Sequence, residues 1–196
     1  MYVHIADVSA FVEHEDETDL VARKLGNSYY FDEETLHMLP DELSTNFLSL
    51  KPGVKRLAFS VKISMDEDFN IREYKFFESV INSDERFTYQ DAEDILEVKP
   101  KNVFSKSLFL LFELTKYLKD QRLSVDGFDM NYEDFSFKVD DKDNSLSIQK
   151  NKRLKSHVIV EECMLLANKL ASEKMLEHVS EPVSYTHLTL PTNGTV

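Results

Sequence analysis

Two adjacent glutamates in an otherwise apolar stretch are the side chains of this sequence best suited to chemistry. Glu161 and Glu162 lie within "SHVIVEECMLLAN", whose hydrophobic residues predict a buried helix. A carboxylate is costly to bury without a partner, so the pair favours either a functional site or a structural ion pair. Neighbouring helical residues point about 100° apart, so we expect only one of them, Glu161 rather than Glu162, to face a site.

The common catalytic and metal-binding motifs do not occur in the sequence. The chain has four glycines and no glycine-rich phosphate loop, and it lacks the C-x-x-C, H-E-x-x-H and G-x-S-x-G patterns. Its six histidines show no ligand spacing. The segment "DKDNSLSIQK" is similar to a calcium loop but lacks its glycine and closing glutamate, which favours a hairpin turn. The single cysteine, Cys163, lies in the apolar helix and is expected to be a structural thiol.

The elements that must position these residues follow from hydrophobic periodicity. We expect strands at residues 2–8, 27–31, 55–65 and 71–83, and a hairpin within 134–150 that turns at 140–144. We expect helices at residues 16–26, 90–98, 107–122 and 156–178. This order predicts an α+β fold, with packed helices and an antiparallel or mixed sheet.

Local signals add detail to these elements. Asp16 or Thr18 can cap the first helix, Gly26 is a natural stop, and Pro100 should end the second helix. The strand at residues 2–8 is apolar and β-branched, which predicts burial. Alternation along residues 55–65 places five apolar side chains on one face: Leu57, Phe59, Val61, Ile63 and Met65.

A series of segments carries the strongest family signal. They are "HIADVSAFV", "GNSYYF", "MLPDELSTNFLSLKPGVKR", "YKFFESVINSDERFTY" and "VIVEECMLLAN". In this order and spacing they resemble the catalytic RNB domain of the ribonuclease II and ribonuclease R family, and ribonuclease R-like members most. The resemblance covers residues 2–183. It implies a processive 3′-to-5′ exoribonuclease that uses Mg²⁺ to release nucleoside 5′-monophosphates from the 3′ end of single-stranded RNA.

The resemblance also implies roles for individual residues. Tyr30 matches a tyrosine that stacks on an RNA base, although a tyrosine of a strand can also belong to the core, and Tyr29 is the better core candidate. Tyr89 matches a tyrosine near the 3′-terminal nucleotide, where its hydroxyl could sense the ribose. Glu161 and Glu162 match a glutamate pair, one of which contacts a terminal ribose.

The irregular segment at residues 38–56 resembles a packed loop beside the RNA channel. Pro40 and Pro52 limit its backbone freedom, and Ser44, Thr45 and Asn46 can satisfy its backbone polar groups. A purely structural loop without RNA contacts is an equal alternative for any single residue there.

The catalytic centre of the family is expected to lie outside this chain. The resemblance places a cluster of metal-binding aspartates just upstream of "IADVS" and an arginine downstream of "EECM", so we expect an internal fragment without catalytic or metal-binding residues. Asp7 is not one of those ligands. The isolated chain should therefore be inactive and bind no Mg²⁺, whereas the full-length enzyme should be a monomer.

The last residues depart from the family pattern. After "EPV" the chain continues as "SYTHLTLPTNGTV", which is polar and threonine-rich. We expect residues 1–183 to form the partial RNB domain and residues 184–196 to be a foreign tail that arose by read-through.

Composition sets the remaining limits. The net charge of −13 argues against a strongly basic nucleic-acid surface, although a local groove can still be positive. No apolar run approaches the roughly 18 residues of a membrane span, and a single cysteine suits a reducing compartment, so we expect a cytoplasmic protein. The rival interpretation is a non-catalytic RNA-binding or interaction module that begins at Met1.

Overall fold

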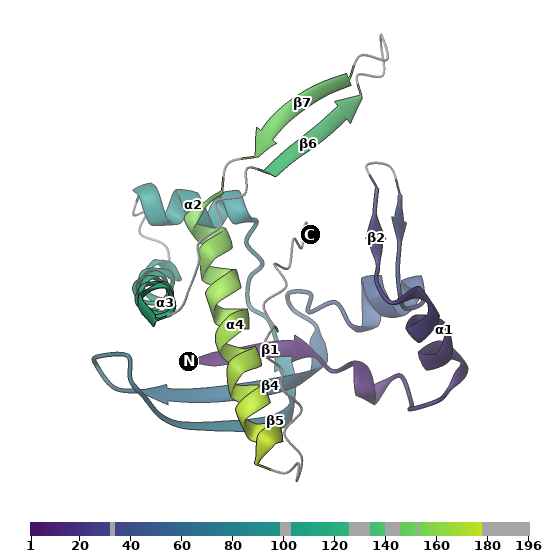
Figure 1. Cartoon of the computed structure of the whole chain (residues 1–196), viewed down its shortest axis with the longest axis horizontal. Coiled ribbons are helices and arrows are strands. Elements are labelled where there is room, and N and C mark those ends of the chain that lie inside the picture. Colours follow the sequence, from purple (N-terminus) through teal and green to yellow (C-terminus); the bar gives the residue numbers. More distant parts are fainter. Residues whose placement is uncertain (32–33, 99–102, 126–133, 140–145, 152, 178–196) are drawn as a thin grey trace. The chain divides into compact units, whose positions relative to one another are not determined.

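The computed structural model describes residues 1–31, 34–98, 103–125, 134–139, 146–151 and 153–177. The expectations for Pro100, the turn at 140–144 and the tail at 184–196 lie outside these residues. The chain divides into two compact units, Met1–Arg86 and a second unit that begins at Phe87 (Figure 1). Each unit is described by itself. Both combine helices with antiparallel ladders, so the predicted α+β class is confirmed.

A three-stranded antiparallel sheet forms the centre of the first unit. Its order is β1 (Tyr2–Ala6), β4 (Lys55–Met65) and β5 (Ile71–Asn82). The bounds of β4 match those predicted from alternation. Within the sheet, the buried Ser60 hydroxyl lies 2.6 Å from His4 Nδ1 and 2.6 Å from the Ser79 hydroxyl, which links the three strands by side-chain hydrogen bonds.

The predicted burial of the first strand is wrong, and the apolar face of β4 is buried only in part. Strand β1 is exposed at Tyr2 (54%) and Ile5 (41%), because it is an edge strand of the described sheet. Along β4, Leu57 and Phe59 are exposed, whereas Ala58 and Ser60 on the other face are buried. The predicted face is buried only farther along, at Val61 and Ile63. Alternation shows which side chains share a face, but coverage of that face depends on the packing around it.

Short elements connect β1 to β4. Helix α1 (Glu17–Leu25) begins where the Asp16 carboxylate accepts the backbone N–H of Asp19 at 2.7 Å. It ends at Gly26, whose φ of 72° lies in the left-handed region that glycine adopts without strain. The Asp16 cap and the Gly26 stop were both predicted from the sequence. A hairpin of β2 (Tyr29–Tyr30) and β3 (Thr35–Leu36) follows.

The irregular segment at residues 38–56 contains one π-helical turn, Leu43–Phe47. The hydroxyl groups of Ser44 and Thr45 donate to the carbonyl oxygens of Leu39 (3.2 Å) and Asp41 (2.7 Å), as expected. Asn46 instead accepts from the Arg56 guanidinium at 3.2 Å, and the same Arg56 donates to the Ser49 carbonyl at 3.0 Å. The segment is therefore tied back to the start of β4.

The described residues of the second unit form three helices and a hairpin. Helices α2 (Tyr89–Val98), α3 (Ser105–Val125) and α4 (Lys155–Leu176) pack against one another (Figure 1). The hairpin pairs β6 (Asp134–Val139) with β7 (Leu146–Asn151). The buried residues of these helices include Ile95, Leu96, Leu114, Thr115, Ile159, Leu166 and Leu170. Helix α4 is not buried all round, because Val160 is 46% exposed. Within the described residues, no helix has the length and apolarity to span a membrane.

Candidate functional site

The first turn of α4 contacts Tyr89, one of the predicted site residues. Tyr89 is the first residue of α2, and its ring stacks on the His157 imidazole with 4.1 Å between ring centroids and 30° between planes. The start of α2 is itself well defined, because the Thr88 hydroxyl accepts the Asp91 N–H at 3.1 Å and the Asp91 carboxylate accepts the Thr88 N–H at 3.0 Å. Tyr89 is therefore half-buried and held at a capped helix terminus.

His157 is the functional candidate that the sequence analysis missed. Its Nδ1 accepts the backbone N–H of Leu154 at 3.0 Å, so this nitrogen carries no proton and the neutral ring is protonated on Nε2. Burial lowers the pKa of His157 below 6.5, the nearby Arg153 charge lowers it further, and Glu93 opposes both effects. The only feature of the sequence that could have pointed to His157 is its position near the start of α4, where a side chain can cap free backbone N–H groups.

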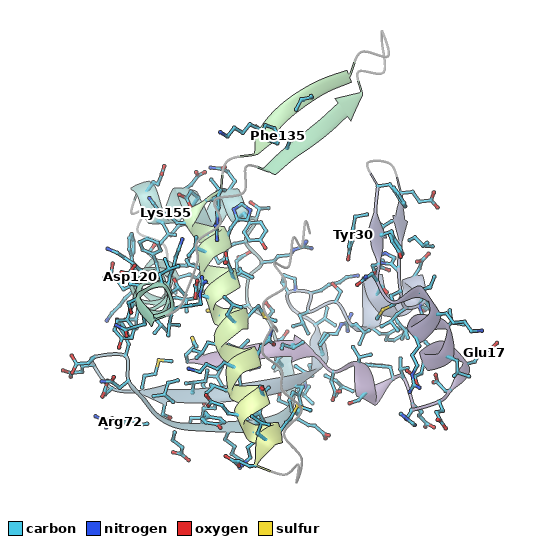
Figure 2. The ribbon with its side chains drawn as sticks, in the orientation of Figure 1. Glu17, Tyr30, Arg72, Asp120, Phe135 and Lys155 are labelled. Carbon is cyan, nitrogen blue, oxygen red and sulfur yellow. The ribbon has the colours of Figure 1, made fainter. Side chains whose placement is uncertain are left out.

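The backbone of Tyr89 is also tied to α4. The Ser156 hydroxyl donates to the Tyr89 carbonyl at 2.8 Å, and the buried Glu93 carboxylate accepts the Ser156 N–H at 3.2 Å. Lys155 lies 3.8 Å from the same carboxylate, at the end of α4 that meets α2 (Figure 2). Consecutive residues of α4 therefore hold both the main chain and the ring of Tyr89.

The two glutamates of α4 occupy different environments. The Glu162 side chain is 3% exposed and accepts a hydrogen bond of 2.5 Å from Arg122 of α3, so it forms the structural ion pair that the sequence left open. Glu161 is 36% exposed, pairs with Arg153 and lies 3.9 Å from Arg122. Glu161 is more exposed than Glu162, which agrees with the preference for Glu161 that was drawn from the sequence.

Tyr89 and Glu161 come together around His157. His157 and Glu161 are four residues apart on α4 and therefore share a face of the helix. Arg153 acts on both, because it pairs with Glu161 and its charge lowers the pKa of His157. We call Tyr89, Arg153, His157 and Glu161 the α4 cluster. It combines an aromatic ring, a carboxylate and a cation, which can stack on a base and hydrogen-bond a sugar.

Tyr30 lies in the first unit, on the β2–β3 hairpin (Figure 2). Its side chain is 58% exposed, so among the described residues it does not belong to a core. The expectation that Tyr29 belongs to the core is wrong, since Tyr29 is 47% exposed. Neighbouring residues of a strand point to opposite faces, so Tyr29 and Tyr30 lie on opposite faces of this hairpin.

The described residues do not fit a magnesium site. They contain no group of three or more histidine, cysteine, aspartate or glutamate side chains that could hold a metal ion. Cys163 is a poor nucleophile or ligand as well, because burial, and then the charge of Glu162, raise the pKa of its thiol to about 11.

Comparisons with known proteins agree with the resemblance found in the sequence. A model of the RNB domain family matches residues 1–194. Ribonuclease R of Aquifex aeolicus is 36% identical over 191 residues, which cover 94% of this chain and 27% of that protein. The structure of Mycoplasma genitalium RNase R in complex with ribose methylated single-stranded RNA is 27% identical with a TM-score of 0.82, covering 90% of this chain and 28% of that one.

A third protein shares the fold alone. Yeast Ssd1, described as a pseudonuclease, is 18% identical with a TM-score of 0.68, covering 88% of this chain and 21% of that one. The chain spans about a quarter of the length of these relatives.

Proposed function

This chain belongs to the RNB domain family, and we propose that it forms part of the catalytic domain of a ribonuclease R-like 3′-to-5′ exoribonuclease. The observation that carries the proposal is the 36% identity to a ribonuclease R along 94% of the chain. The whole enzyme would degrade single-stranded RNA processively from its 3′ end and release nucleoside 5′-monophosphates. Mg²⁺ would be held by residues other than those described.

Within that enzyme, the described residues would bind RNA. Tyr30 would stack on a base, which its 58% exposure permits. Tyr89 would contact the 3′-terminal sugar. Glu161, which is 36% exposed although it pairs with Arg153, would be available to a ribose hydroxyl in place of the buried Glu162. The isolated chain would cleave no RNA, because the described residues contain no group of side chains that could hold a metal ion.

A chimaera tests the proposal directly. Residues 1–183 of this chain replace the corresponding segment of Aquifex aeolicus ribonuclease R, which supplies the rest of the enzyme. We expect Mg²⁺-dependent shortening of a 5′-labelled single-stranded RNA from its 3′ end, with mononucleotide products. The unchanged host enzyme is the positive control. A chimaera that melts cooperatively, as the host does, yet leaves the RNA intact would contradict the proposal.

A non-catalytic RNA-binding module is the second candidate. Two observations favour it. The described residues contain no metal-binding cluster, and a protein described as a pseudonuclease shares the fold. The coding sequence around Met1 distinguishes the two. An in-frame upstream region with clustered aspartates supports the enzyme, whereas a stop codon and a ribosome-binding site immediately before Met1 support the module.

A further inference from the structure

The Tyr89 ring is held by one residue that the family resemblance did not single out. His157 forms the stacking platform, and the Leu154 N–H fixes the orientation of that platform through Nδ1. The main chain of Tyr89 is held separately by the Ser156 hydroxyl. A change at His157 can therefore release the ring and leave the backbone of Tyr89 in place.

We infer that His157 is a positioning residue, which holds the Tyr89 ring for the 3′-terminal nucleotide and can do so only as a neutral imidazole. The inference rests on the proposed function, in which Tyr89 contacts that nucleotide. The reason for the restriction is geometric. Protonation of Nδ1 would turn the acceptor of the Leu154 N–H into a donor, so the hydrogen bond that orients the ring would be lost.

The charged groups around His157 set the direction of its pH response. Arg153, two residues before α4, disfavours the imidazolium, and Glu93 of α2 favours it. Glu161 shares the face of α4 with His157, but it is already paired with Arg153 and lies near Arg122 of α3. Burial is the largest effect, and it holds the pKa of His157 below 6.5. The hydrogen bond from the Leu154 N–H to His157 Nδ1, and the stack on Tyr89 that it orients, are therefore intact at pH 7. Both are lost as the pH falls through the lowered pKa of His157.

The contact can be tested in the full 196-residue chain without RNA. We expect NMR of ¹⁵N-labelled histidine and ¹³C-labelled tyrosine to show His157 with its proton on Nε2 at pH 7.5. On acidification, the Tyr89 ring signals should shift with the same midpoint as His157. The signals of the exposed His14 are the matched control, and they should show no correlation with those of Tyr89. Tyr89 signals that do not follow His157 would overturn the inference.

The role is tested in the chimaera with a double-mutant cycle. The measured quantity is the ratio of degradation rates for RNA ending in ribose and for the same RNA ending in deoxyribose. This ratio cancels pH effects common to both substrates. We expect His157→Ala to lower it about two- to tenfold, the range that an aromatic pair contributes, and to have no further effect in a Tyr89→Ala background. Additive effects would show that His157 does not act through Tyr89.

Conservative variants provide the pH readout. His157→Phe keeps a stacking ring but cannot accept the Leu154 N–H, so its ratio should stay above that of His157→Ala. It should not change as the pH is lowered from 7.5 through the His157 midpoint measured by NMR. The ratio of the unsubstituted chimaera should fall over the same interval, and that of His14→Ala should fall in parallel. A ratio that is independent of pH in the unsubstituted chimaera would overturn the inference.

The outcomes also separate this inference from the proposed function. If Tyr89→Ala lowers the ratio and His157→Ala does not, the proposed role of Tyr89 stands and the positioning role of His157 is overturned. If neither substitution changes the ratio while the chimaera still degrades RNA, the proposed role of Tyr89 fails, and the positioning role fails with it.

Discussion

At the scale of single residues, Glu161 and Glu162 illustrate how far neighbouring carboxylates can differ. Glu162→Gln removes the charge opposite Arg122 from a buried position, and we expect it to lower the free energy of unfolding by about 1–3 kcal/mol. Glu161→Gln affects a half-exposed pair with Arg153, and we expect about 0–1 kcal/mol. Urea denaturation of both variants checks this order, and equal losses would contradict it.

The exposed Tyr30 should matter for RNA and not for stability. Stacking contributes roughly 1–3 kcal/mol per base, so in the chimaera Tyr30→Ala should leave longer end products because short RNA is released earlier. Gel analysis of the end products measures this effect. Tyr29→Ala, on the other face of the same hairpin, is the matched control and should leave the end products unchanged. If Tyr30→Ala mainly lowers the melting temperature, Tyr30 packs in the whole enzyme and its RNA role is wrong.

At the scale of elements, the contact between α2 and α4 decides where the α4 cluster forms. It depends on Glu93, a buried carboxylate of α2 that accepts a backbone N–H from the first turn of α4. A helix terminus leaves such groups without partners inside the helix, so another element must provide the acceptor. The position of Tyr89 relative to His157 is thus a property of two helices together.

Glu93→Ala should therefore destabilise the second unit. The Ser156 N–H is buried and would lose its acceptor, so we expect a loss of about 1–3 kcal/mol in the free energy of unfolding. Glu97→Ala is the matched control, because Glu97 lies on the same helix and near the same Lys155 but is 52% exposed, and it should change stability by at most about 0.5 kcal/mol. Comparable losses in the two variants would show that Glu93 does not link the helices.

At the scale of the whole molecule, the separate chain is expected to be inactive. Purified 196-residue protein should not shorten a 5′-labelled single-stranded RNA, with or without Mg²⁺, because the described residues offer no donor set for the metal. The chimaera, assayed in parallel, serves as the positive control. Shortening of the RNA that EDTA abolishes would show that the chain carries its own catalytic centre.

The last segment gives a second prediction at this scale. The sequence predicts that residues 184–196 are a polar tail foreign to the domain, and on that prediction their deletion should not change the melting temperature. The family match extends to residue 194, which makes the deletion informative. A large drop in the melting temperature on removal of residues 184–196 would mean that they pack on the domain.

The sequence by itself determined the family, the α+β class and most element positions. The strand at Lys55–Met65 and the termini of the first helix agree with the prediction, since alternation, an aspartate cap and a glycine stop act over a few neighbouring residues. The proposal for Tyr89 and the preference for Glu161 also came from the sequence, through the resemblance.

Only the tertiary structure decided what these side chains face. The burial of Glu162 depends on Arg122, which lies 40 residues away along the chain, and the stack of Tyr89 on His157 joins the starts of two helices. The exposed Leu57 and Phe59 show the same limit in the sheet. Periodicity encodes which residues share a face, whereas burial, ion pairing and a histidine's tautomer depend on the element that packs against that face.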